Sequence, residues 1–249
     1  MRTLLTLSLL LTCTSAAQIQ SGVSVIKLGD VISKHSAKPP VTDDRRPADP
    51  PAQAAARAIL EAHTLNEWDT YGFSGPPKEI DGKTETVAML MIDTIWDESF
   101  PPTALVVIGS ILDGDSFVTA ARHSVYSDYH VRVEEVLRQD KDDPAHAGDV
   151  VTTWRSGGAI RFASGHVMNF VIYHKGFPVT GERYVLFLSR WPDIRGRYEI
   201  TVGYQLTGGV VQGLDDGGPY SAYDNVPTTQ FMKTVRAAVA GRKGVLALP

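Results

Sequence analysis

No disulfide bond can form within this chain, because Cys13 is its only cysteine. Small secreted domains that lack a large core depend on such bonds. The chain has 249 residues, of which 43% are hydrophobic, so it is long enough to bury a large core of its own. We therefore expect one main domain that is held together by hydrophobic packing.

A strong positive charge and long hydrophobic runs are also missing. The formal net charge is −4 at pH 7, whereas nucleic-acid-binding domains have strongly basic surfaces. No stretch is apolar over the ~20 residues that a transmembrane helix needs. We expect neither a nucleic-acid partner nor a transmembrane segment.

The common catalytic and metal-binding motifs do not occur. The Gly-x-Ser-x-Gly nucleophile elbow is absent, as are His-Glu-x-x-His and Cys/His pairs at zinc spacing. Ser164 and His166 are close in sequence, but this alone does not make a catalytic triad. We expect no catalytic residue, no metal ligand and no cofactor. The alternative is an envelope hydrolase whose site is assembled from distant residues.

Residues 1–17 have the pattern of a secretory signal peptide. Arg2 is followed by an apolar run over residues 4–11, and Ser15 and Ala17 supply the small side chains that favour cleavage before Gln18. The sequence therefore predicts an exported protein, periplasmic or extracellular.

Two alternatives for this segment stay open. Leu10-Leu11-Thr12-Cys13 resembles a bacterial lipobox, although a smaller residue is usual in place of Thr12, so Cys13 is a candidate lipid anchor. The other alternative is a buried N-terminal helix or strand.

Residues 18–103 are expected to form an N-terminal extension. Five of the fifteen prolines lie between residues 38 and 51, so residues 36–51 are predicted to be a flexible or extended linker. The alanine-rich residues 52–64 favour a helix.

From residue 104 to residue 214 the pattern is typical of an antiparallel β-barrel of five to seven strands. Apolar runs are separated by turns rich in glycine, and several runs are apolar on both faces, which favours a closed barrel or a covered sheet. Asp113-Gly114-Asp115 is predicted to be a turn, and Glu134-Glu135 interrupts a period of two, which indicates a bulge. Tyr129, Val131 and Val133 alternate. The expected strands are residues 105–112, 116–125, 149–155, 167–174, 183–189, 198–204 and 209–214.

Residues 215–249 are predicted to be a loop and a C-terminal amphipathic helix. Phe231, Val235 and Val239 share one face, Thr228 or Thr229 could cap the start, and Gly241 is a plausible end. The fold class is therefore mainly β, with an N-terminal helical extension and this helix packed on the barrel.

Five short patterns within residues 106–211 carry a resemblance to known proteins. They are Val106-Val107-Ile108-Gly109, residues 131–137, Gly148-Asp149-Val150-Val151, Gly157-Gly158 and residues 181–188. They resemble a group of uncharacterised bacterial exported proteins, and their order is similar to the netrin-like barrels of the tissue inhibitors of metalloproteinases, a variant of the OB-fold. The resemblance implies an OB- or netrin-like barrel. It does not imply inhibition, because those inhibitors need a cysteine at the mature N-terminus and this chain has none after Cys13.

Positive charge is concentrated in residues 150–205, where seven basic side chains outnumber three acidic ones. Aromatic rings beside arginines can bind an anionic or sugar-like ligand. The candidate ligand-binding residues are Trp154, Arg155, Arg161 and Tyr173. The alternative is a set of outward-facing arginines with scattered partners. We expect a non-enzymatic binding or interaction module whose partner is a protein or a small anionic or sugar-like ligand.

The mature protein is expected to begin at Gln18, which intact-mass spectrometry of the exported form can test. Cys13→Ser should then leave the mature mass and location unchanged, because Cys13 is removed with the signal peptide. A lipid-modified species that this substitution abolishes would contradict the prediction.

Overall fold

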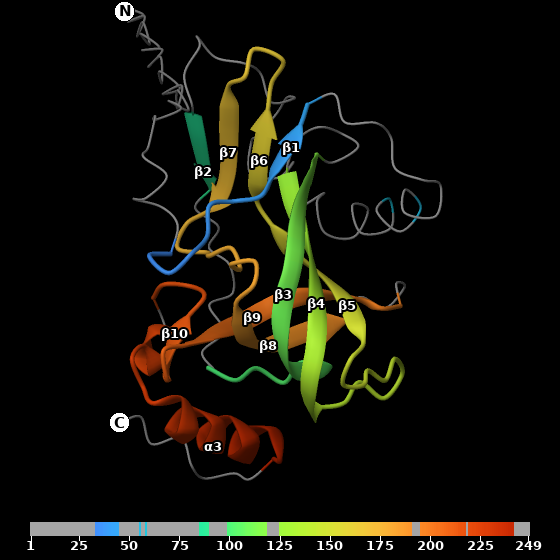
Figure 1. The fold of residues 1–249 in the computed structure, drawn as a ribbon, viewed down its shortest axis with the longest axis vertical. Helices are drawn as coiled ribbons and strands as arrows, with labels where there is room; N and C mark the ends of the chain where they lie inside the picture. The colour runs from blue at the N-terminus through green and yellow to red at the C-terminus, as the bar shows by residue number, and fades with distance from the viewer. Residues whose placement is uncertain are drawn as a thin grey trace, which may run out of the picture.

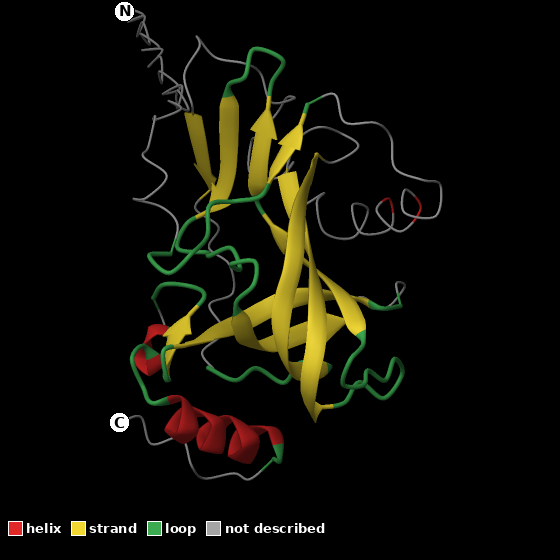
Figure 2. Cartoon of the chain, viewed as in Figure 1, coloured by secondary structure: helices red, strands yellow, loops and turns green. Residues whose placement is uncertain are grey.

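The computed structural model describes residues 33–44, 99–118, 125–190, 195–217 and 219–241, with Ala55, Ala58 and the backbone of residues 85–89. These residues form two β-sheets and a C-terminal helix (Figures 1 and 2). The predicted mainly β fold with antiparallel strands and a C-terminal helix is confirmed. No helix among the described residues is long and apolar enough to cross a membrane.

Several predictions fall on other parts of the chain. The signal peptide over residues 1–17 and Cys13 lie outside the described residues. So does the helix expected over residues 52–64, apart from Ala55 and Ala58, which are helical.

The larger sheet contains a ring of five strands. Its order is β3-β4-β5-β9-β8 and back to β3, and β10 pairs with β9 outside the ring. All neighbours are antiparallel except β5 and β9, which are parallel over three residue pairs. The β5–β9 seam is thus the shortest pairing in the ring. The strands are β3 (Leu105–Val118), β4 (Val125–Arg138), β5 (Val150–Ser156), β8 (Arg183–Arg190), β9 (Arg197–Thr207) and β10 (Val210–Gly213).

The smaller sheet has the order β1-β6-β7-β2. Its central strands are antiparallel, and each outer strand is parallel to its neighbour. It lies beyond the β3–β4 hairpin from the C-terminal helix (Figure 1). The strands are β1 (Val41–Asp43), β2 (Glu85–Met89), β6 (Gly158–Arg161) and β7 (Val167–Ile172).

Strand β1 belongs to the segment that was expected to be a linker. Residues 36–44 are extended, but they pack against the fold, because the carbonyl of Pro40 accepts a hydrogen bond from Ala159 N at 2.9 Å and Asp44 N donates to the Arg161 carbonyl. β1 is an edge strand of the smaller sheet and directly follows Pro39 and Pro40, which have no backbone N–H to pair.

The predicted break at Glu134-Glu135 is confirmed as a β-bulge. Ile108 pairs with Glu135 and Gly109 with Val133, which leaves Glu134 as the extra residue. Inside the ring the side chains form a core of aliphatic and aromatic residues. Its largest members include Tyr129, Phe177, Tyr184 and Tyr198.

The predicted turn at Asp113-Gly114-Asp115 is wrong, because these residues continue β3. Gly114 pairs with Tyr129, and a Cβ added to Gly114 would lie 2.7 Å from the Tyr129 ring. Glycine at position 114 allows the two strands to approach closely. The Asp-Gly dipeptide is common in hairpin turns, but here it lies within a strand.

The C-terminal helix α3 (Thr228–Val239) covers the outer face of β3, β8 and β9 (Figure 1). Phe231 and Val235 are fully buried there, as their spacing predicts. Neither Thr228 nor Thr229 caps the helix: Pro227 is the N-cap residue and no side chain caps the first turn. Phe231 packs in a group of rings with Phe100, Phe187, Tyr204 and Tyr223, the last from a short 3-10 helix, Ser221–Tyr223.

Phe231→Ala should lower the free energy of unfolding by about 3–5 kcal/mol, because it leaves a cavity among these rings. Urea denaturation measures the change. Lys233→Ala on the exposed side of the same helix is the control and should change stability by less than about 0.5 kcal/mol. Equal losses from both variants would show that α3 is not anchored through Phe231.

Candidate functional site

The four residues predicted from sequence to bind a ligand do not share one surface. Trp154 and Arg155 are adjacent on β5, so they face opposite sides of the sheet, and they are only 1% and 3% exposed. Arg161 ends β6 in the smaller sheet and pairs with Asp43 at 3.5 Å. Tyr173 follows β7 and packs partly buried against the barrel core.

Arg155 points into the barrel and is used there. Its guanidinium donates to the Asp215 carboxylate at 2.5 Å and to the Gly176 carbonyl at 2.6 Å. Asp215 also accepts a hydrogen bond from Gly176 N at 2.9 Å. Both charged side chains are almost fully buried, and their pairing accounts for the burial of Arg155.

Gly176 lies where the turn between β7 and β8 meets the segment after β10. A Cβ on Gly176 would lie 1.9 Å from the Leu214 carbonyl oxygen, so only glycine fits. The Arg155–Asp215–Gly176 contacts therefore join three segments, and we call them the clasp.

Two tyrosines beside the clasp are buried, and burial keeps their hydroxyls protonated. Burial raises the pKa of Tyr129 well above its usual value, although the charge of Arg155 opposes this. Burial also raises the pKa of Tyr184 to about 12. Both hydroxyls stay protonated at neutral pH, so neither supplies a base or a nucleophile.

Most other basic side chains of residues 150–205 also have acidic partners. Arg183 pairs with Glu134, Arg190 with Asp140 and Asp142, and Arg197 with the buried Asp128. The local excess of positive charge in the sequence is therefore largely neutralised by partners from elsewhere in the chain. It does not form one basic surface.

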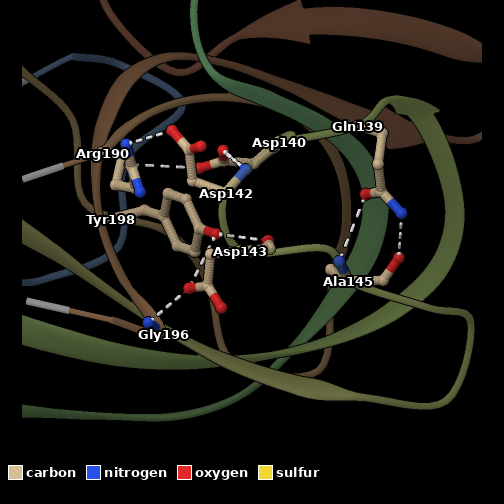
Figure 3. A network of polar contacts seen from close by, with 8 residues as sticks. All are labelled: Gln139, Asp140, Asp142, Asp143, Ala145, Arg190, Gly196 and Tyr198. Atoms are coloured by element: carbon tan, nitrogen blue, oxygen red, sulfur yellow. Dashed lines mark hydrogen bonds and ion pairs between the residues drawn. The ribbon is translucent and has the colours of Figure 1, made fainter.

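Figure 3 shows the polar contacts between the β4–β5 loop and Arg190, Gly196 and Tyr198. Arg190 donates to Asp142 at 2.6 Å, and Asp143 accepts from Gly196 N at 2.5 Å. The Tyr198 hydroxyl lies 3.1 Å from the Asp143 carbonyl, and burial together with the nearby aspartates raises its pKa. These contacts fix the loop to β8 and β9.

One part of the outer barrel wall remains exposed. Arg183, Ser110, Arg132 and Val150 are directly opposite one another on β8, β3, β4 and β5, so their side chains share one face. Asp113, His130 and Thr152 form the next row. Val150 is 51% exposed, which is unusual for a valine in this fold. We call these seven residues the open face.

Charges on the open face are paired with one exception. His130 Nδ1 lies 2.5 Å from Asp113, and Arg183 donates to Glu134 at 2.5 Å. Burial raises the pKa of Glu134, but hydrogen bonds from Ser110 and Arg183 and the charge of Arg183 outweigh it, so the net pKa is lowered. Among the described residues no acidic side chain pairs with Arg132, which is exposed beside Val150.

Ser164 and His166 contact each other within a single turn. The Ser164 hydroxyl lies 2.9 Å from His166 Nδ1, but both belong to one exposed turn. Within the described ranges, no group of three or more His, Cys, Asp or Glu side chains could hold a metal ion.

Sequence reasoning missed the open face. Arg132 and Val150 are 18 positions apart, and only the pairing of β4 with β5 places them together. The available signal was Val150 itself, an apolar residue at the start of a strand and on the same face as Thr152. No protein-family model matches this chain, and neither does any curated protein.

Removing one partner of the clasp should destabilise the fold. Arg155→Leu leaves Asp215 buried without its cation and is expected to cost about 3–5 kcal/mol, and Arg155→Leu with Asp215→Asn should recover part of the loss. Arg161→Leu is the control, because its exposed pair with Asp43 is worth less than about 1 kcal/mol. Denaturant unfolding of the three variants measures this, and an Arg155→Leu protein as stable as the control would contradict a structural role.

Proposed function

We propose that this chain is an exported, non-enzymatic binding module built on an OB-like barrel, and that it contacts its partner through the open face. The observation that carries the proposal is the position of Arg132, an unneutralised cation directly opposite the half-exposed Val150. Within residues 150–205, by contrast, most described cations have acidic partners.

The strand order supports the OB-like part of this proposal. In chain order the ring strands are β3, β4, β5, β8 and β9, and they are arranged as first, second, third, fifth and fourth. OB-folds are five-stranded, partly open barrels that bind ligands on the face of their second and third strands. Here those strands are β4 and β5, which carry Arg132 and Val150.

The chemistry of the face indicates the kind of partner. An isolated guanidinium favours a carboxylate or another anion, and the exposed valine adds apolar contact. The ion pairs Arg183–Glu134 and His130–Asp113 on either side would orient a partner without adding much affinity. A protein partner with an acidic residue beside an apolar one fits this surface best.

Site-specific photo-crosslinking tests the proposal in the native envelope. A benzoylphenylalanine at position 150 should crosslink to a partner, and the same group at exposed position 233 on α3 should not. Adding Arg132→Glu should reduce the crosslink at least about tenfold, since a favourable charge contact becomes repulsive. Identical crosslinks from both positions, or a crosslink that Arg132→Glu leaves unchanged, would remove the reason for choosing this surface.

A further inference from the structure

Residues 33–44, which we call the arm, lead into β1 of the smaller sheet (Figure 1). At its start the arm binds Asp216: the Ser33 hydroxyl donates to one carboxylate oxygen and Lys34 N to the other, both at 3.1 Å. These partners are 183 and 182 positions apart in sequence.

The middle of the arm makes contacts through its backbone and hydroxyls. Ala37 N donates to the Phe177 carbonyl at 2.9 Å, and Phe177 N donates to the Ser36 hydroxyl at 2.6 Å. The Pro40 carbonyl then accepts from the Ser116 hydroxyl at 2.5 Å, before β1 joins the sheet. An extended segment held in this way is bound by the same contacts as a peptide that adds a strand to a sheet edge.

The surface under the arm is acidic where the arm is basic. Asp224 lies 4.0 Å from the Lys34 ammonium and 3.8 Å from His35 Nε2. Asp215, next to Asp216, is neutralised by Arg155 inside the barrel. Asp216 and Asp224 are therefore the carboxylates that face the arm, and with Phe177, Ser116 and Ala159 they form what we call the seat.

The barrel holds both aspartates by contacts outside the arm, Asp216 through its backbone and Asp224 through its carboxylate. Asp216 N donates to the His174 carbonyl at 2.9 Å, and Asp224 accepts from Gly213 N at 2.8 Å. His174 and Asn225, which adjoin them, have φ of 61° and 64°, the two positive values among described non-glycine residues. Such backbone strain often occurs where a ligand is clamped.

We propose that the seat is a recognition site for an extended segment that carries a hydroxyl followed by basic residues, and that the arm of a second copy of this chain occupies it in trans. The arm already demonstrates the fit. In an isolated chain its own arm fills the seat, because a tethered segment competes at an effective concentration of about millimolar. The arm of another copy enters where the seat is empty.

Two complementary variants test this in full-length protein. The seat variant carries Asp216→Asn and Asp224→Asn and keeps a normal arm, whereas the arm variant carries Ser33→Ala, Lys34→Ala and Ser36→Ala and keeps a normal seat. Each should be monomeric alone, and mixing should give a one-to-one complex in light scattering. The seat variant should bind the arm variant at least about tenfold more tightly than it binds wild type, whose seat is filled.

Thermal unfolding of each variant provides the folding control. Asp142→Asn with Asp149→Asn matches the charge change of the seat variant, and Lys233→Ala matches that of the arm variant, at exposed positions away from the seat. If both variants unfold like wild type and the mixture stays monomeric, the proposal is overturned. If either is unfolded, Asp216→Asn and Ser33→Ala alone replace the multiple changes, with a labelled peptide of residues 33–44 as ligand. Equal binding of that peptide by the Asp216→Asn and Ser33→Ala proteins would also overturn it, because the carboxylates would then carry no recognition.

Discussion

The ion pair between Arg155 and Asp215 is the contact on which the remaining arrangement depends. It joins β5 to the segment after β10, and Gly176 brings in the turn before β8 through both its N–H and its carbonyl. A chain with no cysteine after Cys13 has no covalent means of holding three such distant segments together. A buried pair is costly to desolvate, and here Gly176 gives each charged group one further hydrogen bond, while Arg155 Nε has no partner among the described residues.

The clasp also determines which surfaces are left for binding. Arg155 pairs with Asp215 inside the barrel, and Arg190 and Arg197 pair with carboxylates of a loop and a strand. The positive charge of residues 150–205 therefore does not produce a positively charged surface. Among the described residues, the outer wall keeps a small mixed face on which the Arg132 guanidinium has no acidic partner. A surface of this kind favours a specific, oriented partner over non-specific attraction to polyanions.

Much of the fold could be predicted from the sequence, because strand and helix periodicity are local. The alternation around Val131 and the bulge at Glu134 are both found in β4, and Phe231 and Val235 anchor α3 as their spacing indicates. The site could not be predicted in the same way. Whether Arg155 faces solvent or Asp215 depends on a contact across 60 positions, and local composition carries no information about it. Gly114 shows the same limit, since it serves the Tyr129 ring and not a turn.

The two sheets meet at a junction that explains why the arm belongs to the fold. Strands β3 and β4 extend beyond the ring toward the smaller sheet. At the ends of these strands, the Ser116 hydroxyl donates to the Pro40 carbonyl of the arm and the Ser127 hydroxyl donates to the Gly157 carbonyl. A Cβ on Gly158 would lie 2.4 Å from the Ser116 hydroxyl, so the strands approach closely there. Without the arm, the Ala159 and Phe177 backbone groups at this junction would lose their partners. An unsatisfied buried backbone group costs about 1–3 kcal/mol, and this cost is the physical reason that an empty seat would accept another extended segment.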